Sequence, residues 1–177
     1  PNYARGYFGV HNQNEKSSNQ TIDALKNISS GTIDLDAVSM IFKIKNDVGV
    51  DIKVNINELV GTNSSNNTSV TLSSPLSNNT INLNRASENN GPYSSTVSTT
   101  YQTVLNASNS NVTEFVSNIP NILSYDFDIQ LNPLGNVSNS NDFIYHKTGM
   151  SIELDAEIPF KFNATDLVID VAAAQTV

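Results

Sequence analysis

The sequence predicts an all-β fold, mainly an antiparallel β-sandwich, with one short helix near residues 111–119. Three observations lead to this fold class: several segments alternate apolar and polar residues, loops rich in Asn and Ser separate them, and one segment has helical spacing. Successive side chains of a strand point to opposite faces, so each alternating segment has an apolar and a polar face. The expected architecture is a two-layer, immunoglobulin-like sandwich, with some strands curling toward a barrel as the alternative.

The longest alternation runs through residues 150–162. Its apolar members are Met150, Ile152, Leu154, Ala156, Ile158, Phe160 and Phe162. Extended throughout, the run would span roughly 40 Å at about 3.3 Å per residue. Because Pro159 cannot donate a hydrogen bond to a neighbouring strand, we expect an edge position or a bulge there. We expect the apolar stripe to be sealed against a second sheet.

A second pair of alternating runs covers residues 38–44 and 48–56. The apolar residues are Val38, Met40, Phe42 and Ile44, then Val48, Val50, Ile52, Val54 and Ile56. Between the runs stand Asn46, Asp47 and Gly49, residue types that tolerate left-handed backbone dihedrals. The pattern predicts a β-hairpin that turns at residues 46–49.

Shorter strands and one helix complete the predicted elements. The shorter strands are expected around residues 3–10, 70–72, 81–83, 97–105, 125–131, 143–146 and 167–171. The helix should begin after Asn111, which can cap it, with Glu114 as the partner of a capping box, and it should end at Pro120. Its apolar residues at helical spacing are Val112, Phe115, Val116 and Ile119. Residues 21–27 are compatible with either a helical turn or a loop.

The length of 177 residues fits a single β-sandwich domain, residues 1–177, that can bury about two thirds of its unfolded surface. Residues 3–10 already look like a strand and residues 172–175 look like a tail that runs on. We therefore expect a domain excised from a longer chain. The absence of Cys excludes thiol catalysis, thiolate zinc sites and disulfides from these residues.

The charge and polarity of the chain indicate which partners and which location are expected. The formal net charge is -8, which disfavours nucleic acid phosphates and anionic membrane surfaces as partners. No stretch approaches the roughly 20 apolar residues of a membrane span, so no transmembrane segment is predicted. Asn, Ser and Thr exceed a third of the residues, whereas charged residues are 15%. Such a surface favours an extracytoplasmic location: secreted, on the cell surface or in the periplasm.

Acidic residues at alternating positions are the main candidates for chemistry. They are Asp34 with Asp36, Asp126 with Asp128, and Glu153 with Asp155 and Glu157. Carboxylates from two neighbouring strands could bind calcium, or could supply the acid and the base of a glycosidase. Since apolar residues stand between them, we interpret each set as the solvated face of a half-buried strand. The loop at residues 139–142 also offers oxygens suited to calcium, although the EF-hand pattern is absent.

Other catalytic and cofactor motifs are missing from the sequence. His11 and His146 are the two imidazoles, and neither lies in a motif with metal-ligand spacing. The sequence has no Gly-x-Ser-x-Gly elbow and no phosphate-binding glycine loop. We therefore predict that the protein is not an enzyme and has no catalytic, cofactor or metal site.

Three segments carry a resemblance to a known group of proteins. They are residues 5–9 (RGYFG), residues 42–50 (FKIKNDVGV) and residues 131–136 (LNPLGN), the last leading into residues 149–167. With these segments the chain resembles uncharacterised exported, lipoprotein-like β-sandwich proteins of Bacteroidetes-type bacteria. Residues 42–50 are also similar to the Asn-turn-strand pattern of water-stress β-sandwich domains. The resemblance implies an extracytoplasmic β-sandwich without a known activity, although the lipid-attachment Cys of a lipoprotein is absent here.

Three functions are compatible with these observations. We favour a non-catalytic structural or adhesion module of the cell surface or periplasm, whose partners are other surface or envelope components. A carbohydrate-binding domain is the first alternative, and the tyrosines available to stack on a glycan are Tyr3, Tyr7, Tyr93, Tyr101, Tyr125 and Tyr145. The second alternative is a carrier of a lipid or another apolar ligand, in which the stripe that starts at Met150 lines a cavity.

Overall fold

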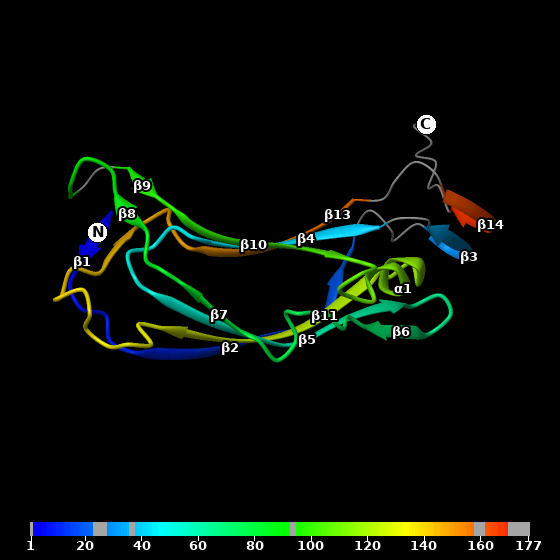
Figure 1. Ribbon diagram of the computed structural model, residues 1–177, viewed down its shortest axis with the longest axis horizontal. Helices are drawn as coiled ribbons and strands as arrows, with labels where there is room; N and C mark the ends of the chain where they lie inside the picture. Colours follow the sequence, from blue (N-terminus) through cyan, green and yellow to red (C-terminus); the bar gives the residue numbers. More distant parts are fainter. Residues whose placement is uncertain (1, 23–27, 36–37, 93–94, 158–161, 170–177) are drawn as a thin grey trace, which may run out of the picture.

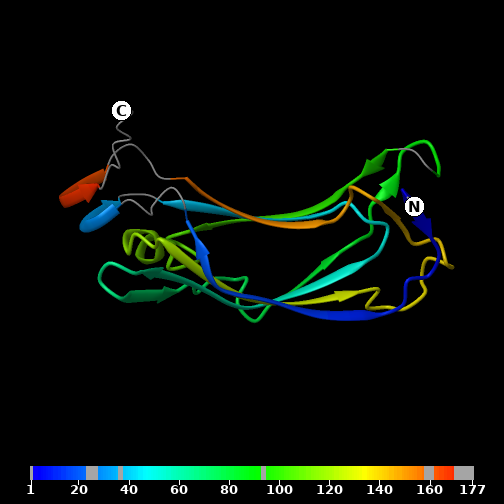
Figure 2. The same ribbon diagram turned by 180° about the vertical axis from the view of Figure 1, so that it is seen from behind.

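Two antiparallel sheets face each other as the layers of a sandwich (Figure 1), and Figure 2 shows the same layers from behind. The computed structural model describes residues 2–22, 28–35, 38–92, 95–157 and 162–169. The smaller sheet has the strand order β10 (Thr99–Asn106), β4 (Ser39–Asn46) and β13 (Met150–Glu157). The larger sheet has the order β2 (His11–Thr21), β11 (Ile122–Leu131), β5 (Ile52–Asn63) and β6 (Thr68–Thr71), and β7 (Thr80–Leu83) also pairs with β5. The predicted all-β, mainly antiparallel fold is confirmed.

Three two-stranded ribbons flank the sandwich. They are β1 (Tyr3–Arg5) with β12 (Phe143–Tyr145), β3 (Ile28–Leu35) with β14 (Phe162–Ile169), and β8 (Ser87–Glu88) with β9 (Thr96–Val97). The first ribbon lies at one end of the long molecule and the second at the other end (Figure 1). The short strands that the sequence predicts at residues 70–72, 81–83, 97–105, 125–131 and 143–146 correspond to β6, β7, β9 with β10, β11 and β12.

The helix predicted near residues 111–119 is confirmed as α1 (Val112–Ser117). It contacts β3, β4, β6 and β10, and its buried side chains are Val112, Phe115 and Val116. Asn111 is the N-cap residue, but its side chain does not cap the helix: Oδ1 accepts the backbone N–H of Ser73 at 2.7 Å. The helix ends before Pro120, as predicted, and α1 fills one end of the sandwich.

The core lies between the two layers and contains the alternating residues of β4 and β5. The buried side chains of these runs are Val38, Met40, Phe42, Ile44, Val48, Val50, Ile52, Val54 and Ile56. A bulge follows in β5, because Asp126 of β11 pairs with Glu58 whereas Phe127 pairs with Ile56. The extra residue, Asn57, shifts the alternation by one position, so that Leu59 is buried.

The predicted β-hairpin at residues 38–56 is wrong. β4 pairs with β10 and β13 in one layer, while β5 pairs with β11 in the other, so residues 47–51 cross between the sheets. Buried Asn46 holds this crossing, since its amide donates to the Val50 carbonyl at 2.9 Å and to the Asn84 carbonyl at 3.0 Å. The crossing places the apolar faces of β4 and β5 opposite each other, one in each layer, so that both contribute to the core between the sheets.

The N-terminal strands also differ from expectation. Only Tyr3–Arg5 of the strand expected at residues 3–10 forms, and Gly9 adopts a φ of 84° that favours glycine. Strand β2 has no counterpart among the predicted strands, because residues 11–21 contain no apolar side chain. Residues 21–27 are expected to form a helical turn or a loop. Thr21 is the last residue of β2 and Ile22 is not helical, whereas residues 23–27 lie outside the described residues.

The long run at residues 150–162 belongs to two strands. β13 ends at Glu157 and β14 begins at Phe162. Ala156 is exposed, whereas Ile158, Pro159 and Phe160 lie outside the described residues. Of the expected apolar stripe, Met150, Ile152 and Leu154 are therefore the residues that the structure places toward the interior.

Gly49 permits a close approach between the crossing segment and β12. A Cβ atom on Gly49 would lie 2.2 Å from Cδ1 of the buried Phe143 ring. We predict that Gly49→Ala lowers the free energy of unfolding by about 1–3 kcal/mol, because the ring must move within a packed core. Gly149→Ala is the control, since its added methyl group meets no atom within 4 Å. Urea denaturation compares the two variants, and equal losses of stability would contradict this prediction.

Candidate functional site

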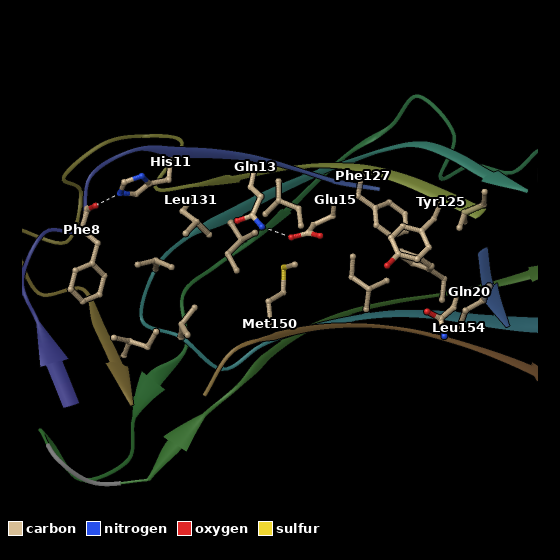
Figure 3. Close-up of a pocket in the computed structure, with 18 of the residues that line it drawn as sticks. Phe8, His11, Gln13, Glu15, Gln20, Tyr125, Phe127, Leu131, Met150 and Leu154 are labelled. Carbon is tan, nitrogen blue, oxygen red and sulfur yellow. Dashed lines mark hydrogen bonds between the residues drawn. The ribbon is translucent and has the colours of Figure 1, made fainter. Parts of the chain in front are cut away.

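The two sheets enclose a groove with a volume of about 710 Å³ (Figure 3). Side chains from both layers and from the segment that crosses between them line it. Most of the lining is apolar or aromatic: Phe8, Phe42, Val48, Val50, Ile52, Leu59, Leu123, Tyr125, Phe127, Ile129, Leu131, Phe143, Ile144, Met150, Ile152 and Leu154. The four polar lining residues are His11, Gln13, Glu15 and Gln20. All four come from the single strand β2.

The groove lies along one side of the sandwich (Figure 3). On the other side, β7 of the larger sheet contacts β10 of the smaller sheet and covers the core there. On the side of the groove, β2 and β13 are the terminal strands of their sheets, and side chains of both line the groove. Among the described residues, no strand pairs with the outer edge of either of them. The open side of the groove thus runs between two free sheet edges.

The stripe that starts at Met150 lines this groove. Met150, Ile152 and Leu154 are half-buried and pack against the edge of the core. Figure 3 shows Met150 pointing toward Gln13 and Glu15 across the groove. The expectation that the stripe is sealed against a second sheet holds only in part. These three residues pack against the core, but they also line the open groove, one wall of which carries the polar side chains of β2.

Strand β11 forms the floor of the groove. Its inward side chains Leu123, Tyr125, Phe127, Ile129 and Leu131 follow one another along the groove. The rings of Tyr125 and Phe127 stack with centroids 5.0 Å apart and an angle of 13° between their planes. The eight residue steps from Leu123 to Leu131 correspond to roughly 26 Å at about 3.3 Å per residue. The groove is therefore long and largely apolar.

The polar wall of the groove is the part of the site that sequence reasoning missed. Gln13 lies opposite Ile129 and Glu15 lies opposite Phe127 in the β2–β11 register. Because paired residues share a face of the sheet, these two polar side chains point to the same side as buried Ile129 and Phe127. No alternating pattern in the sequence identifies Gln13 and Glu15 as residues of a groove. The only sequence signal for this wall is that residues 11–21 are all polar.

A network of charged and amide groups supports one end of the groove. Asp142 is buried and pairs with Arg85 at 3.1 Å, and Arg85 also pairs with Asp51 at 2.6 Å. The amide of Asn132 donates to Asp142 at 2.7 Å, and the backbone N–H of Phe8 donates to it at 3.2 Å. The network joins the start of β5 to the ends of two loops. The carboxylate of the loop at residues 139–142 thus points inward and pairs with Arg85.

Of the acidic sets predicted on strand faces, the two that the structure describes lie on different sheets. Asp126 and Asp128 lie on β11 of the larger sheet, whereas Glu153, Asp155 and Glu157 lie on β13 of the smaller sheet. Asp36 and the side chain of Asp34 lie outside the described parts of the chain.

Asp126 and Asp128 form a hydrogen-bonded cluster with Asn14, Asn57 and Lys16. Each Asp accepts a hydrogen bond from Asn14 at 2.8 Å, and Lys16 pairs with Asp126 at 2.6 Å. Hydrogen bonds from Lys16 and Asn14 lower the pKa of Asp126, and hydrogen bonds from Asn57 and Asn14 lower the pKa of Asp128. A glycosidase acid needs a raised pKa, so this pair is poorly suited to donate a proton.

Both histidines, and the tyrosines Tyr3 and Tyr145, make local contacts. Nε2 of His11 lies 2.6 Å from the Phe8 carbonyl, and the backbone N–H of His146 donates to the Asn2 carbonyl at 3.0 Å. Within the described ranges, no group of three or more His, Asp or Glu side chains could hold a metal ion. The rings of Tyr3 and Tyr145 pack 4.8 Å apart, and both hydroxyl groups donate to Glu88.

We predict that the contribution of Asp142 to stability disappears at acid pH. Burial raises the pKa of Asp142, but hydrogen bonds from Ser138, the Phe8 N–H and Asn132, with the charge of Arg85, outweigh burial and lower the pKa. A lowered pKa in the folded state means that this stabilisation is present above the ordinary Asp value of about 3.9 and is lost as pH falls through the folded value.

Asp142→Asn should therefore lower the free energy of unfolding by about 1.5–3 kcal/mol at neutral pH. The difference from the unmodified protein should narrow between about pH 5 and pH 2, because the carboxylate then becomes protonated in both states. Urea denaturation across this pH range measures it. Asp155→Asn, at an exposed position of β13, should show a much smaller difference at every pH. A constant Asp142→Asn effect down to low pH would contradict the prediction.

Comparisons with protein-family models, with curated proteins and with solved structures give no match for this chain. Among the described residues, no helix has the length and apolar character needed to cross a bilayer. The features that bear on function are therefore those of the groove itself: its apolar floor, its free edges and its single polar wall.

Proposed function

We propose that this protein binds an elongated apolar ligand, such as the hydrocarbon chain of a lipid, in the groove between its two sheets. The observation that carries the proposal is the position of Met150, Ile152 and Leu154, which line an open groove of about 710 Å³ and remain only half-buried. Apolar side chains that face a groove are stabilised when a ligand removes them from water.

The dimensions of the groove support this proposal. Pockets for small molecules and cofactors have volumes of about 300–1,000 Å³ and are lined mainly by apolar and aromatic side chains with few polar groups. The groove agrees with that description in volume and in lining. One leaflet of a bilayer has a hydrocarbon thickness of about 15 Å, half of the roughly 30 Å core. A floor of roughly 26 Å along β11 can therefore accommodate an extended acyl chain together with its head group.

A structural or adhesion role is compatible with the fold. However, such a role does not explain why the sandwich contains an open apolar groove. A module that only supports other envelope components is most stable with a filled core, since each unfilled cavity removes packing contacts. Here the apolar residues of β13 face a polar wall across open space. We therefore place ligand binding ahead of the structural role that the sequence favours.

A carbohydrate-binding function has less support from the tyrosines. Tyr93 lies outside the described residues, and of the other tyrosines Tyr7 alone is exposed. Tyr125 faces the groove, and Tyr3 packs on Tyr145. These residues form no shared aromatic platform on which a sugar ring could stack. The non-catalytic nature of the protein and its extracytoplasmic location stay predictions from the sequence.

We predict that the protein binds straight-chain alcohols with an affinity that rises with chain length. Each added CH₂ that enters the groove should strengthen binding about fourfold, the equivalent of roughly 0.8 kcal/mol, until the groove is filled. Displacement of the uncharged fluorophore N-phenyl-1-naphthylamine by alcohols of roughly eight to sixteen carbons measures this series.

A matched pair of Leu→Gln variants localises the binding. Leu154→Gln places an amide in the groove and should weaken binding about tenfold, because the amide loses water contacts when the ligand enters. Leu134→Gln changes a leucine that is 77% exposed and does not line the groove, so binding should stay within about twofold. Circular dichroism confirms that both variants fold. Absence of binding by the unmodified protein, or equal weakening in both variants, would overturn the proposed function.

A further inference from the structure

Strand β2 does not follow the usual pattern of a sandwich strand. The inward face of such a strand normally carries apolar residues that interdigitate with the opposite sheet. β2 instead turns His11, Gln13 and Glu15 toward the groove, on the same face as the apolar residues of β11. A break of this kind in an otherwise consistent fold is typical of a functional position.

The Glu15 carboxylate has an incomplete set of partners. Gln13 donates a hydrogen bond to it from the same strand (Figure 3). Lys16 is adjacent in sequence but points to the opposite face of the sheet, where it pairs with Asp126 at 2.6 Å. His11 shares the face of Glu15 but lies four residues away, roughly 13 Å along the strand. Among the described lysines, arginines and histidines, none lies within 4 Å of this carboxylate.

A ligand in the groove changes the surroundings of this charge. Figure 3 shows Glu15 facing Met150 across the groove. An apolar chain that fills the space between them displaces water from the groove side of the carboxylate. Removing water from an unpaired charge is unfavourable unless a group of opposite charge or a hydrogen-bond donor replaces the water. An anionic head group would add like-charge repulsion, and the net charge of -8 opposes anions at long range as well.

We propose that the occupant of the groove is a cationic amphiphile, with its apolar chain along β11 and β13 and its amine head group on Glu15. This inference rests on the proposed function and adds the chemical class of the ligand. The carboxylate accepts hydrogen bonds from the ammonium group, while Gln13 supplies a further polar contact beside it. The apolar floor supplies affinity, and the single acidic residue on the wall supplies the selectivity for a positive charge.

The test compares three amphiphiles with the same chain and different head groups: dodecylammonium, 1-dodecanol and dodecanoate. Each displaces N-phenyl-1-naphthylamine at neutral pH, below its micelle concentration. The unmodified protein should bind dodecylammonium about tenfold more tightly than dodecanoate, because a hydrogen bond to a charged group is worth about this factor. 1-Dodecanol should bind with intermediate affinity.

Variants of Glu15 assign the selectivity to this residue. Glu15→Gln should weaken dodecylammonium binding about tenfold and leave 1-dodecanol within about twofold. Glu15→Lys should reverse the preference in favour of dodecanoate. Glu58→Gln removes the same charge from an exposed position outside the groove and should leave the preference intact, which separates local contact from net charge. Circular dichroism verifies folding of all three variants.

The outcomes distinguish this inference from the function on which it rests. Equal binding of the three amphiphiles, or an unchanged preference in Glu15→Gln, overturns the cationic head group while 1-dodecanol binding still supports an apolar-ligand site. Failure of all three ligands to bind overturns both proposals. A dimer in analytical ultracentrifugation that Leu154→Gln dissociates would assign the groove to a second copy of the chain and would also overturn both.

Discussion

The shape of this protein depends on the polar character of one edge strand. β2 is held in the larger sheet by its backbone pairing with β11, and this pairing needs no apolar side chain. Because its inward residues include Gln13 and Glu15, burying them against the apolar side chains of β13 would cost hydration without providing partners. Among the described residues, the layers contact each other through β7 and β10, whereas side chains of β2 and β13 line the groove. The groove follows directly from this constraint.

The rest of the structure keeps the two layers in place around the groove. Asn46 holds the segment that crosses from β4 to β5, and Gly49 lets Phe143 pack against that segment. Arg85 joins Asp51 of this region to Asp142 of a distant loop. At the other end, α1 buries its apolar face against the strands. These contacts hold the two sheets apart around a packed core and so maintain the shape of the groove.

Much of the fold could be predicted from the sequence, but less of the candidate site. The alternation at residues 38–44 and 48–56 identified two strands and their buried faces, and Asn111 to Pro120 marked the helix. The same alternation could not show that the two strands belong to different sheets, because period two is identical in a hairpin and in a crossing between layers. Met150, Ile152 and Leu154 were recognised as an apolar stripe, with the lining of a cavity as one alternative.

By itself, the sequence determined the strands with alternating apolar residues, their apolar faces and the position of the helix, because these properties follow from the order of side chains along a few residues. It did not mark the all-polar strand β2. Only the tertiary structure decided that Glu15 stands beside Phe127 and faces Met150, residues more than a hundred positions away. The pairing of β2 with β11 by backbone hydrogen bonds brings Glu15 beside Phe127, and the packing of the two sheets brings it opposite Met150. Side-chain periodicity encodes neither arrangement. The proposed ligand site depends on both.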